Sequence, residues 1–293
     1  MSSLKIRRLS YALGGEITGI DLREELDAQD VAEIRAAWAD LGILLVRGQE
    51  LTPAQHIAFS RRLGALDDHS ALYKYRHPDY PEIFLISDKI KADGMAFETS
   101  KTGLRWHSDL SYTLRPAMGS LLYCVEIAEV GGNTEFTNCY MAYETLSDSF
   151  KKLIEPLRAI HDIRSGLQAT ENVRNPESTA ALKKLNPPVV HPIVFLHPET
   201  KRKAIYVSEH SSTRIVGMSL EESNAILQFL FRHSVRPEFT YRHQWRPNDL
   251  VMWDNRCVMH KALMDRLPGT VRHMHRTTIL GEQRGELFSE ELQ

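Results

Sequence analysis

Short apolar segments typical of β-strands recur along the chain, and this pattern constrains the fold more than any other feature. They are separated by turns or polar stretches and do not alternate regularly with helices, as they would in a βαβ protein. The pattern predicts a mainly β protein with flanking helices, and we expect a double-stranded β-helix, or jelly roll. The predicted strands are 13–22, Ile43–Val46, Leu121–Ile127, Thr134–Thr137, Val189–Leu196, Ala204–Val207, Leu250–Trp253 and Arg276–Leu280.

Four segments carry the start signals or the apolar spacing of helices. Ser219 and Glu222 form a capping box, in which each side chain would bind a backbone N–H group of the other's turn. The predicted helices begin at Asp27, at Thr52–Pro53, near Ser147 and at Ser219, and the first three end at Gly42, at Gly64 and near Leu157. These helices are expected to pack outside the strands.

The length of 293 residues fits one large domain or two small ones, and we predict a single domain over residues 1–293. Two polar segments, at about residues 70–105 and 164–188, show little periodicity. Long segments of this kind in a compact domain are usually functional or disordered, so we interpret both as lids over a site. For residues 164–188 the alternative is a surface loop without a role.

The charge balance is nearly even, with 36 Lys and Arg residues against 38 Asp and Glu residues. A nucleic-acid-binding protein normally has a basic excess or stripe, so no nucleic-acid partner is expected. The sequence has no apolar run of the roughly 20 residues that a membrane span needs, and no apolar signal core, which predicts a cytoplasmic protein without a membrane partner. Its three cysteines are far apart in sequence, which favours buried free thiols.

The sequence Trp106-His107-Ser108-Asp109 contains a histidine and an aspartate at alternate positions. In an extended segment, alternate side chains point to the same side, so both would reach one point in space. Two imidazoles and one carboxylate form the facial triad of non-haem Fe(II) oxygenases, which leaves coordination positions for a co-substrate and O₂. The alternative for this pair is a surface histidine beside a capping aspartate.

The third ligand of such a triad is predicted to be His260, which follows the apolar strand Leu250–Trp253. A strand end at the mouth of a barrel is a natural position for a metal ligand. The alternatives are that His260 is a core histidine with satisfied hydrogen bonds, or that His273 or His275 takes the third position.

Two arginines, Arg272 and Arg276, occupy alternate positions of a strand-like segment and would point to one face. Because burying two guanidinium groups without partners is very costly, we predict that two anions meet them. Arginine suits this role because its planar fork grips a carboxylate or sulfonate with two parallel hydrogen bonds. The alternative is a pair of structural salt bridges on an edge strand.

Several motifs, taken together and in this order, carry a family resemblance. They are L-G-G-E-I-T-G-I-D-L at 13–22, W-H-S-D at 106–109, G-G-N-T-E-F at 131–136, D-L-V-M-W-D-N-R-C-V-M-H at 249–260 and M-H-R-T-T-I-L-G at 274–281. Over nearly its whole length the chain resembles the taurine dioxygenase and 2,4-dichlorophenoxyacetate dioxygenase family of Fe(II)/2-oxoglutarate-dependent enzymes. Residues 241–260 look most similar to the herbicide-degrading branch.

The resemblance implies a role for each matching position. The implied iron ligands are His107, Asp109 and His260, the implied clamps on the far carboxylate of 2-oxoglutarate are Thr134 and Arg272, and the implied substrate-binding residues are His69 and Arg276. Where members of the family can have an asparagine shortly before the H-x-D motif, this chain has Gly103. That departure weakens the case for taurine itself as the substrate.

The expected reaction uses Fe(II), 2-oxoglutarate and O₂ to hydroxylate a small anionic organic substrate, with release of succinate and CO₂. One candidate substrate is an aryloxyalkanoate that is cleaved to a phenol and a carbonyl acid, and the alternative is an alkyl sulfonate or alkyl sulfate. The resemblance also implies a homodimer or homotetramer, and Asp109 argues against halogenation. Other possibilities are a zinc-dependent hydrolase, a non-catalytic anion-binding barrel, and an oxygenase that desaturates or epimerises its substrate.

Overall fold

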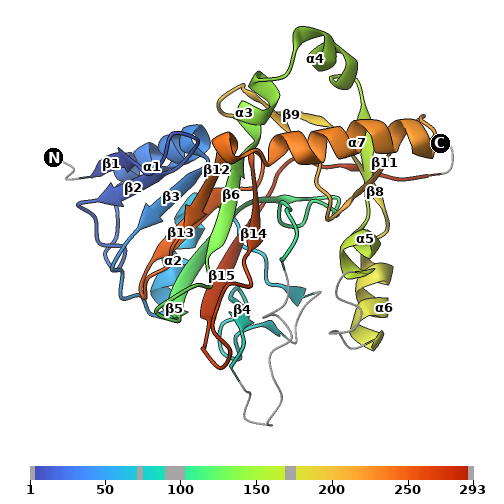
Figure 1. Ribbon diagram of the computed structural model, residues 1–293. Coiled ribbons are helices and arrows are strands. Elements are labelled where there is room, and N and C mark those ends of the chain that lie inside the picture. The colour runs from blue at the N-terminus through green and yellow to red at the C-terminus, as the bar shows by residue number, and fades with distance from the viewer. Residues whose placement is uncertain (1–3, 71–74, 90–102, 169–175, 290–293) are drawn as a thin grey trace.

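A computed structural model describes residues 4–70, 75–89, 103–168 and 176–289. Its central feature is a seven-stranded sheet, which lies against smaller sheets and is flanked by helices (Figure 1). In order across the sheet, its strands are β1 (Lys5–Arg8), β2 (Gly15–Thr18), β3 (Ile43–Val46), β13 (Leu250–Asp254), β5 (Ala117–Glu126), β15 (His273–Leu280) and β4 (Phe84–Ser87). All neighbours in this sheet are antiparallel except β2 and β3.

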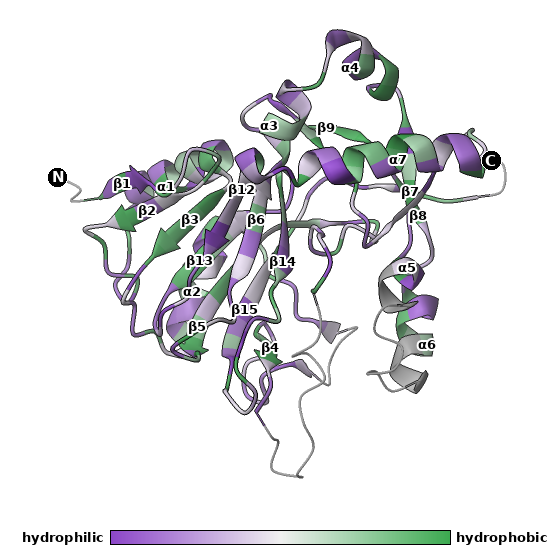
Figure 2. Cartoon of the chain, in the orientation of Figure 1, coloured by the Kyte–Doolittle hydropathy of each residue, from purple (hydrophilic) through white to green (hydrophobic). Residues whose placement is uncertain are grey.

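Both faces of the large sheet are buried, and alternate residues of each strand face opposite sides. In β3, Leu44 packs with residues of the helices α1 (Ala28–Leu41) and α2 (Pro53–Leu63), while Leu45 packs with residues of the smaller sheet on the other side. Figure 2 accordingly shows β3 as hydrophobic along its length, whereas α7 (Leu220–Ser234) alternates hydrophobic and hydrophilic positions.

Three smaller sheets complete the β structure. The one that faces the large sheet across the apolar core contains β12 (Thr240–His243), β6 (Thr134–Asn138) and β14 (Val258–Ala262). The others contain β11 (Ser212–Ile215), β7 (Arg158–His161), β8 (Val189–Pro192) and β16 (Glu286–Leu287), and β10 (Lys203–Ile205) with β9 (Val194–Leu196). The remaining helices are α3 (Cys139–Glu144), α4 (Asp148–Ile154), α5 (Ile163–Gln168), α6 (Pro176–Leu185) and the 3₁₀ turn η3 (Pro237–Phe239).

The capping signals in the sequence account for the predicted helix starts. Asp27 accepts a hydrogen bond from the backbone N–H of Asp30, and Thr52 and Ser219 each form a capping box. Gly42 ends α1 with a φ of 75°, a conformation that glycine adopts without strain. Among the described residues, every helix is too short or too polar to span a lipid bilayer.

Some predicted boundaries were wrong. The helix predicted from Ser147 to Leu157 ends at Ile154, and the strand predicted over Val189–Leu196 is two strands, β8 and β9. The described residues between 164 and 188 are mostly helical, in α5 and α6, and not loop as predicted. Of the two predicted lid segments, residues 71–74, 90–102 and 169–175 lie outside the described residues.

Candidate metal centre and anion sites

The structure brings His107, Asp109 and His260 together, although they come from distant parts of the chain. One ligand atom from each lies within 4.8 Å of the others, and Asp109 Oδ1 lies 3.8 Å from His107 Nε2. His260 belongs to β14, and its backbone exchanges hydrogen bonds with that of His107 in an isolated bridge. The H-x-D segment is therefore extended only at His107, because Asp109 already lies in a turn.

The surroundings of both imidazoles favour the neutral form. Burial lowers the pKa of His107, and burial together with the neighbouring His107 holds the pKa of His260 well below its ordinary value. The Nδ1–H group of His107 donates to the carbonyl oxygen of Arg105 at 2.7 Å, which leaves the lone pair on Nε2 facing the cluster. His260 Nδ1 is buried without a hydrogen-bond partner among the described residues, and His260 Nε2 lies 3.9 Å from Asp109 Oδ2.

Asp109 is a buried carboxylate that stays ionised. Burial alone would raise its pKa, but the charge of Arg276 and a hydrogen bond from Ser120 hold its pKa well below the usual range. Arg276 Nη1 donates to Oδ1 at 2.8 Å, and Ser120 Oγ donates to Oδ2 at 2.7 Å. The backbone N–H of Asp109 donates to Asn255 Oδ1 at 3.0 Å. Sequence reasoning missed Ser120 and Asn255.

Arg272 is a second buried arginine in the same cavity, and it lies immediately before β15 rather than within it. Its Nε donates to the carbonyl oxygen of Gly132 at 3.2 Å, and among the described residues no carboxylate lies within ion-pair distance. Burial lowers its pKa to about 10, so it remains charged at neutral pH. Across the cavity, Thr134 Oγ1 accepts a hydrogen bond from Trp245 Nε1 at 3.0 Å.

Arg276 lies in β15 with its guanidinium group 4.9 Å from the centre of the Phe84 ring. Its Nε is buried and has no hydrogen-bond partner among the described residues. β15 lies between β5 and β4, so the alternative of an edge strand was wrong. His69 does not line the cavity but packs against Phe84, which does, and burial followed by the charge of Arg276 lowers the pKa of His69 to about 4.

The cavity at this site has a volume of about 130 Å³. It joins the three clustered side chains to both arginines and to Thr134, and apolar groups such as Phe84 and Leu110 complete its wall. Gly103 is part of the wall, with a φ of 71°, and a Cβ atom there would lie 3.2 Å from His107 Cε1. This position thus favours glycine both for its backbone conformation and for the space beside the imidazole.

Sequence reasoning also missed His210, whose ring lies 5.3 Å from that of His107 and which lines the same cavity. No motif in the sequence marks this residue. The competing ligands His273 and His275 are not part of the cluster: Nδ1 of His273 lies 2.9 Å from Ser87 Oγ, and the His275 ring packs against His77.

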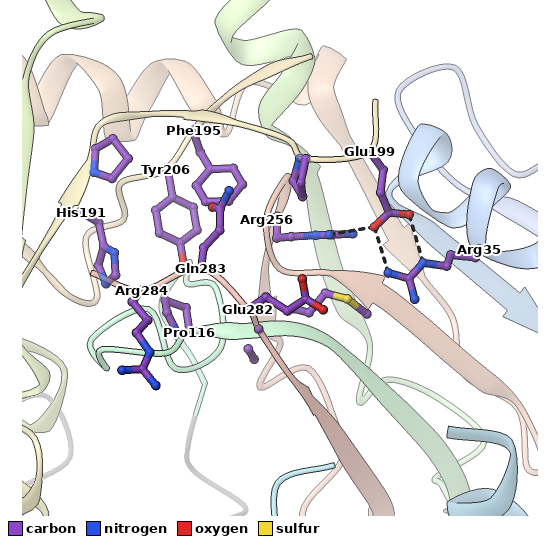
Figure 3. A pocket seen from close by; sticks show the side chains of 15 residues that line it. Arg35, Pro116, His191, Phe195, Glu199, Tyr206, Arg256, Glu282, Gln283 and Arg284 are labelled. Carbon is purple, nitrogen blue, oxygen red and sulfur yellow. Dashed lines mark hydrogen bonds and ion pairs between the residues drawn. The ribbon is translucent and has the colours of Figure 1, made fainter. Parts of the chain in front are cut away.

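A larger cavity, of about 380 Å³, shares no lining residue with this site (Figure 3). On one side of it, Glu199 accepts hydrogen bonds from both Arg35 and Arg256. Arg256 also donates to Asp254, the last residue of β13, so the charged groups on this side of the cavity are already paired.

A second group of potential ligands, His197, Asp254 and Cys257, lies beneath this larger cavity and is fully buried. Its hydrogen bonds are complete. His197 Nδ1 accepts from the backbone N–H groups of Glu199 and Thr200, so Nε2 carries the proton and donates to Asp254 Oδ2 at 3.1 Å. Asp254 also binds Arg256, so this group has the chemistry of a structural network.

Comparisons with known proteins identify the family of the chain. The sequence matches the family model described as "Taurine catabolism dioxygenase TauD, TfdA family" over residues 5–278. The Alpha-ketoglutarate-dependent 2,4-dichlorophenoxyacetate dioxygenase of Burkholderia sp. (strain RASC) is 30% identical, and the match covers 92% of this chain and 92% of that protein. The Alkylsulfatase of Acinetobacter baylyi is 32% identical, with coverage of 95% and 86%.

A solved structure resembles the whole chain as well. The crystal structure of AAD-2 in complex with Mn(II) and N-oxalylglycine has a TM-score of 0.83 and 29% identity, and the match covers 98% of this chain and 100% of that chain. The sequence motifs, the family model, the relatives and the fold all indicate the same family. The chain therefore belongs to the TauD/TfdA family and is an alpha-ketoglutarate (2-oxoglutarate)-dependent dioxygenase.

Proposed function

We propose that this dioxygenase binds Fe(II) through His107, Asp109 and His260. The observation that carries the proposal is the state of His260, a buried ring with neither nitrogen hydrogen-bonded among the described residues and with a carboxylate oxygen 3.9 Å away. The nitrogen that faces Asp109 is Nε2, and its lone pair, which no donor among the described residues uses, is available to a metal ion. Ligands of one divalent ion lie about 2 Å from it, hence about 4 Å or less from one another, and Asp109 lies 3.8 Å from His107 Nε2 and 3.9 Å from His260 Nε2.

The donor set favours iron. Two imidazoles and one carboxylate on one face of an octahedron leave positions for 2-oxoglutarate and O₂, as in non-haem Fe(II) oxygenases. A divalent metal also accompanies AAD-2, which was crystallised with Mn(II). Asp109 fills the position that a halide would need, so we propose an oxygenase without halogenase activity.

We propose that Arg272 and Thr134 hold the far carboxylate of 2-oxoglutarate. The guanidinium group of Arg272 is buried without an ion-pair partner among the described residues, which is a strong reason for an anion to bind there. Thr134 Oγ1 already accepts the indole N–H of Trp245, which can only donate, so the single hydroxyl proton is left to donate to a carboxylate oxygen. N-oxalylglycine, present with AAD-2, carries two carboxylates as 2-oxoglutarate does.

The substrate anion is proposed to bind Arg276, with His69, which packs against Phe84 outside the cavity lining, as the second substrate-binding residue. The Arg276 Nε group is buried and unpaired among the described residues, and the apolar ring of Phe84 lies beside both side chains. A small organic carboxylate or sulfonate fits this combination of one cation and apolar walls. We propose an aryloxyalkanoate, as in the name of the Burkholderia relative, with an alkyl sulfonate or sulfate as the second candidate because of the Acinetobacter relative.

When bound, Fe(II) and 2-oxoglutarate supply oxygen activation, with release of succinate and CO₂ and hydroxylation of a substrate C–H bond. The protein's contribution is position and the exclusion of water. Because Arg276 touches Asp109, an anion held by Arg276 lies directly beside the metal ligands. Residues 70–105 and 164–188 are proposed to cover the cavity, and Gly103 leaves beside His107 the space that an asparagine side chain would fill.

The proposed architecture is a jelly roll in a single domain. Its support is the apolar core between the large sheet and the three-stranded sheet, which contains Leu45, Trp253 and Phe136. The cavity lies where residues of both sheets, such as Arg276 and His260, approach one another.

The test is an anaerobic titration of the protein with Fe(II) and 2-oxoglutarate, followed by a screen of small anions. Binding of 2-oxoglutarate to iron is expected to give a visible charge-transfer band, and the true substrate is expected to perturb it. On admission of O₂, that compound should yield stoichiometric succinate and a hydroxylated or cleaved product.

Three results would contradict the proposal. Hydrolysis by the Zn(II)-loaded protein without O₂ would indicate a metallohydrolase. Absence of the band despite bound iron would indicate that 2-oxoglutarate is held elsewhere. Substrate loss with an alkene or an epimer as product would keep the cofactors and overturn the hydroxylation outcome.

A further inference from the structure

The turn between β13 and β14 contains a buried asparagine whose orientation is fixed by its neighbours. Asn255 Oδ1 accepts hydrogen bonds from the backbone N–H of Asp109 and from Trp253 Nε1, both at 3.0 Å. A backbone N–H and an indole N–H can only donate, so the amide oxygen must face them. The NH₂ group of Asn255 therefore points the other way, toward Ser120.

This orientation dictates the direction of the next hydrogen bond. Asn255 Nδ2 donates to Ser120 Oγ at 3.2 Å, and Ser120 Oγ lies 2.7 Å from Asp109 Oδ2. A serine hydroxyl has one proton, and its acceptor side is occupied by the asparagine. Ser120 must therefore donate to the carboxylate, so Asn255 holds Asp109 twice: at its backbone directly, and at its side chain through Ser120.

The turn itself is anchored from its other side. Asp254 accepts hydrogen bonds from His197 and Arg256, and Arg256 continues to Glu199 in the wall of the larger cavity (Figure 3). The backbone N–H of Asn255 donates to the carbonyl oxygen of Met118 on β5. Asn255 thus cannot move without breaking a buried ionic network or its contact with the large sheet.

From this chain of contacts we propose that Asn255 is a positioning residue for the metal centre, acting through Ser120. Ser120 binds one oxygen of the Asp109 carboxylate and Arg276 binds the other, so together they fix the rotation of the carboxylate. Outer partners of this kind orient a ligand and commonly contribute ten- to a hundredfold to metal affinity. The inference rests on the proposed function, in which Asp109 is a metal ligand.

The first test is the dissociation constant for Mn(II), which needs no turnover. Ser120→Ala is expected to weaken Mn(II) binding by about ten- to a hundredfold. The matched control is Thr278→Val: Thr278 pairs with Ser120 in the register of β15 and β5, is fully buried, and its hydroxyl has no partner among the described residues. This control is expected to bind Mn(II) as the wild type does. Equal affinity of Ser120→Ala and wild type would overturn the proposal.

The second test asks whether Asn255 acts through Ser120. Asn255→Asp keeps the shape and both accepted hydrogen bonds but removes the Nδ2 donor. The added charge acts on the metal in any background, so it cancels in a double-mutant cycle with Ser120→Ala. Loss of the Nδ2 donor should weaken Mn(II) binding only while Ser120 is present, so the effects of the two substitutions on Mn(II) affinity are expected to be strongly non-additive. Strictly additive effects would exclude the route through Ser120.

A spectroscopic readout separates positioning from general loss of structure. The visible absorption of the Co(II)-loaded protein reports the arrangement of ligands, and it is expected to change in Ser120→Ala and to overlay the wild type in Thr278→Val. If Ser120→Ala does not fold, Ser120→Cys, which keeps the bulk and offers a poorer donor, is measured in its place. A wild type that binds no divalent metal would overturn the proposed function, whereas a wild type that binds and variants that match it would overturn this inference alone.

Discussion

Two buried clusters in this protein contain a histidine beside an aspartate, and they differ in how their hydrogen bonds are satisfied. In the cluster beneath the larger cavity, both nitrogens of His197 are engaged and Asp254 binds a histidine and an arginine. In the cluster of the smaller cavity, His260 makes no side-chain hydrogen bond among the described residues, and His107 presents an unprotonated Nε2.

The difference teaches that residue types at metal-ligand distance do not by themselves make a metal site. Both clusters have ligand atoms within 4.8 Å of one another. Only the cluster of His107, Asp109 and His260 has lone pairs that nothing else in the described structure uses. The arginines extend the contrast, since the guanidinium group of Arg256 binds two carboxylates whereas that of Arg272 binds none among the described residues.

The largest effect is expected when the cluster of His107, Asp109 and His260 loses its carboxylate. Asp109→Ala is expected to abolish both Mn(II) binding and succinate formation, because two neutral imidazoles then lack the anionic ligand that faces them. The measurements are a Mn(II) titration and succinate quantified by NMR. The wild type should bind one ion per chain and the variant none; a second equivalent bound at the cluster of His197, Asp254 and Cys257 would break the comparison.

The next largest effect is expected on the stability of the protein, when the cluster of His197, Asp254 and Cys257 loses its carboxylate. Asp254→Ala leaves Arg256 and His197 buried without their carboxylate, and breaking a buried pair in this way typically costs about 3–5 kcal/mol. The free energy of unfolding of the metal-free protein, measured with urea, is expected to fall by that amount. Glu199→Gln, at the more exposed end of the same network, is the control and should cost less than about 1 kcal/mol.

The two unequal arginines can be separated by steady-state kinetics. Arg272→Ala is expected to raise the KM for 2-oxoglutarate roughly a hundredfold, which corresponds to about 3 kcal/mol of lost binding free energy. The KM for the substrate should change much less. Arg276→Ala should do the reverse. If each variant instead affected both compounds equally, the assignment of one arginine to each anion would be wrong.

The smallest effect tests the orientation of one hydroxyl. Trp245→Phe removes the N–H that occupies the acceptor side of Thr134, so the hydroxyl proton is no longer held toward the cavity. The expected result is a rise in the KM for 2-oxoglutarate by a few fold, about 1 kcal/mol, with metal affinity unchanged. An unaltered KM in a folded variant would show that Thr134 needs no such partner.

Much of the site could be predicted because its residues lie in contiguous motifs. His107 and Asp109 lie two positions apart in a four-residue motif, and both arginines lie within one segment. Residue type and spacing marked them as candidates, and the family resemblance implied their roles. Ser120, Asn255 and Trp245 were missed for a physical reason. Their importance lies in the direction of hydrogen bonds between residues far apart in the chain, such as Asn255 and Ser120, and sequence does not display such directions.

The fold was predictable where helix caps or apolar runs in the sequence mark elements that are buried in the structure. The caps at Asp27, Thr52 and Ser219 set helix starts correctly, and the apolar runs of β3 and β13 are both buried on two faces. The helix α6 was missed because its segment, PESTAALKKL, is largely polar, and of its described side chains Leu182 is the one packed in an apolar cluster. Its proline at the first position was the available signal.

The position of β13 has a consequence for synthesis of the protein. This strand, from residues 250–254, lies between β3 and β5 at the middle of the large sheet. In a nascent chain, the edges of β3 and β5 that pair with β13 therefore stay unpaired until residues 250–254 have emerged, and pairings over such sequence separations close slowly. Chaperone dependence during expression, and aggregation of chains truncated before residue 250, are the expected price of placing a late strand at the centre.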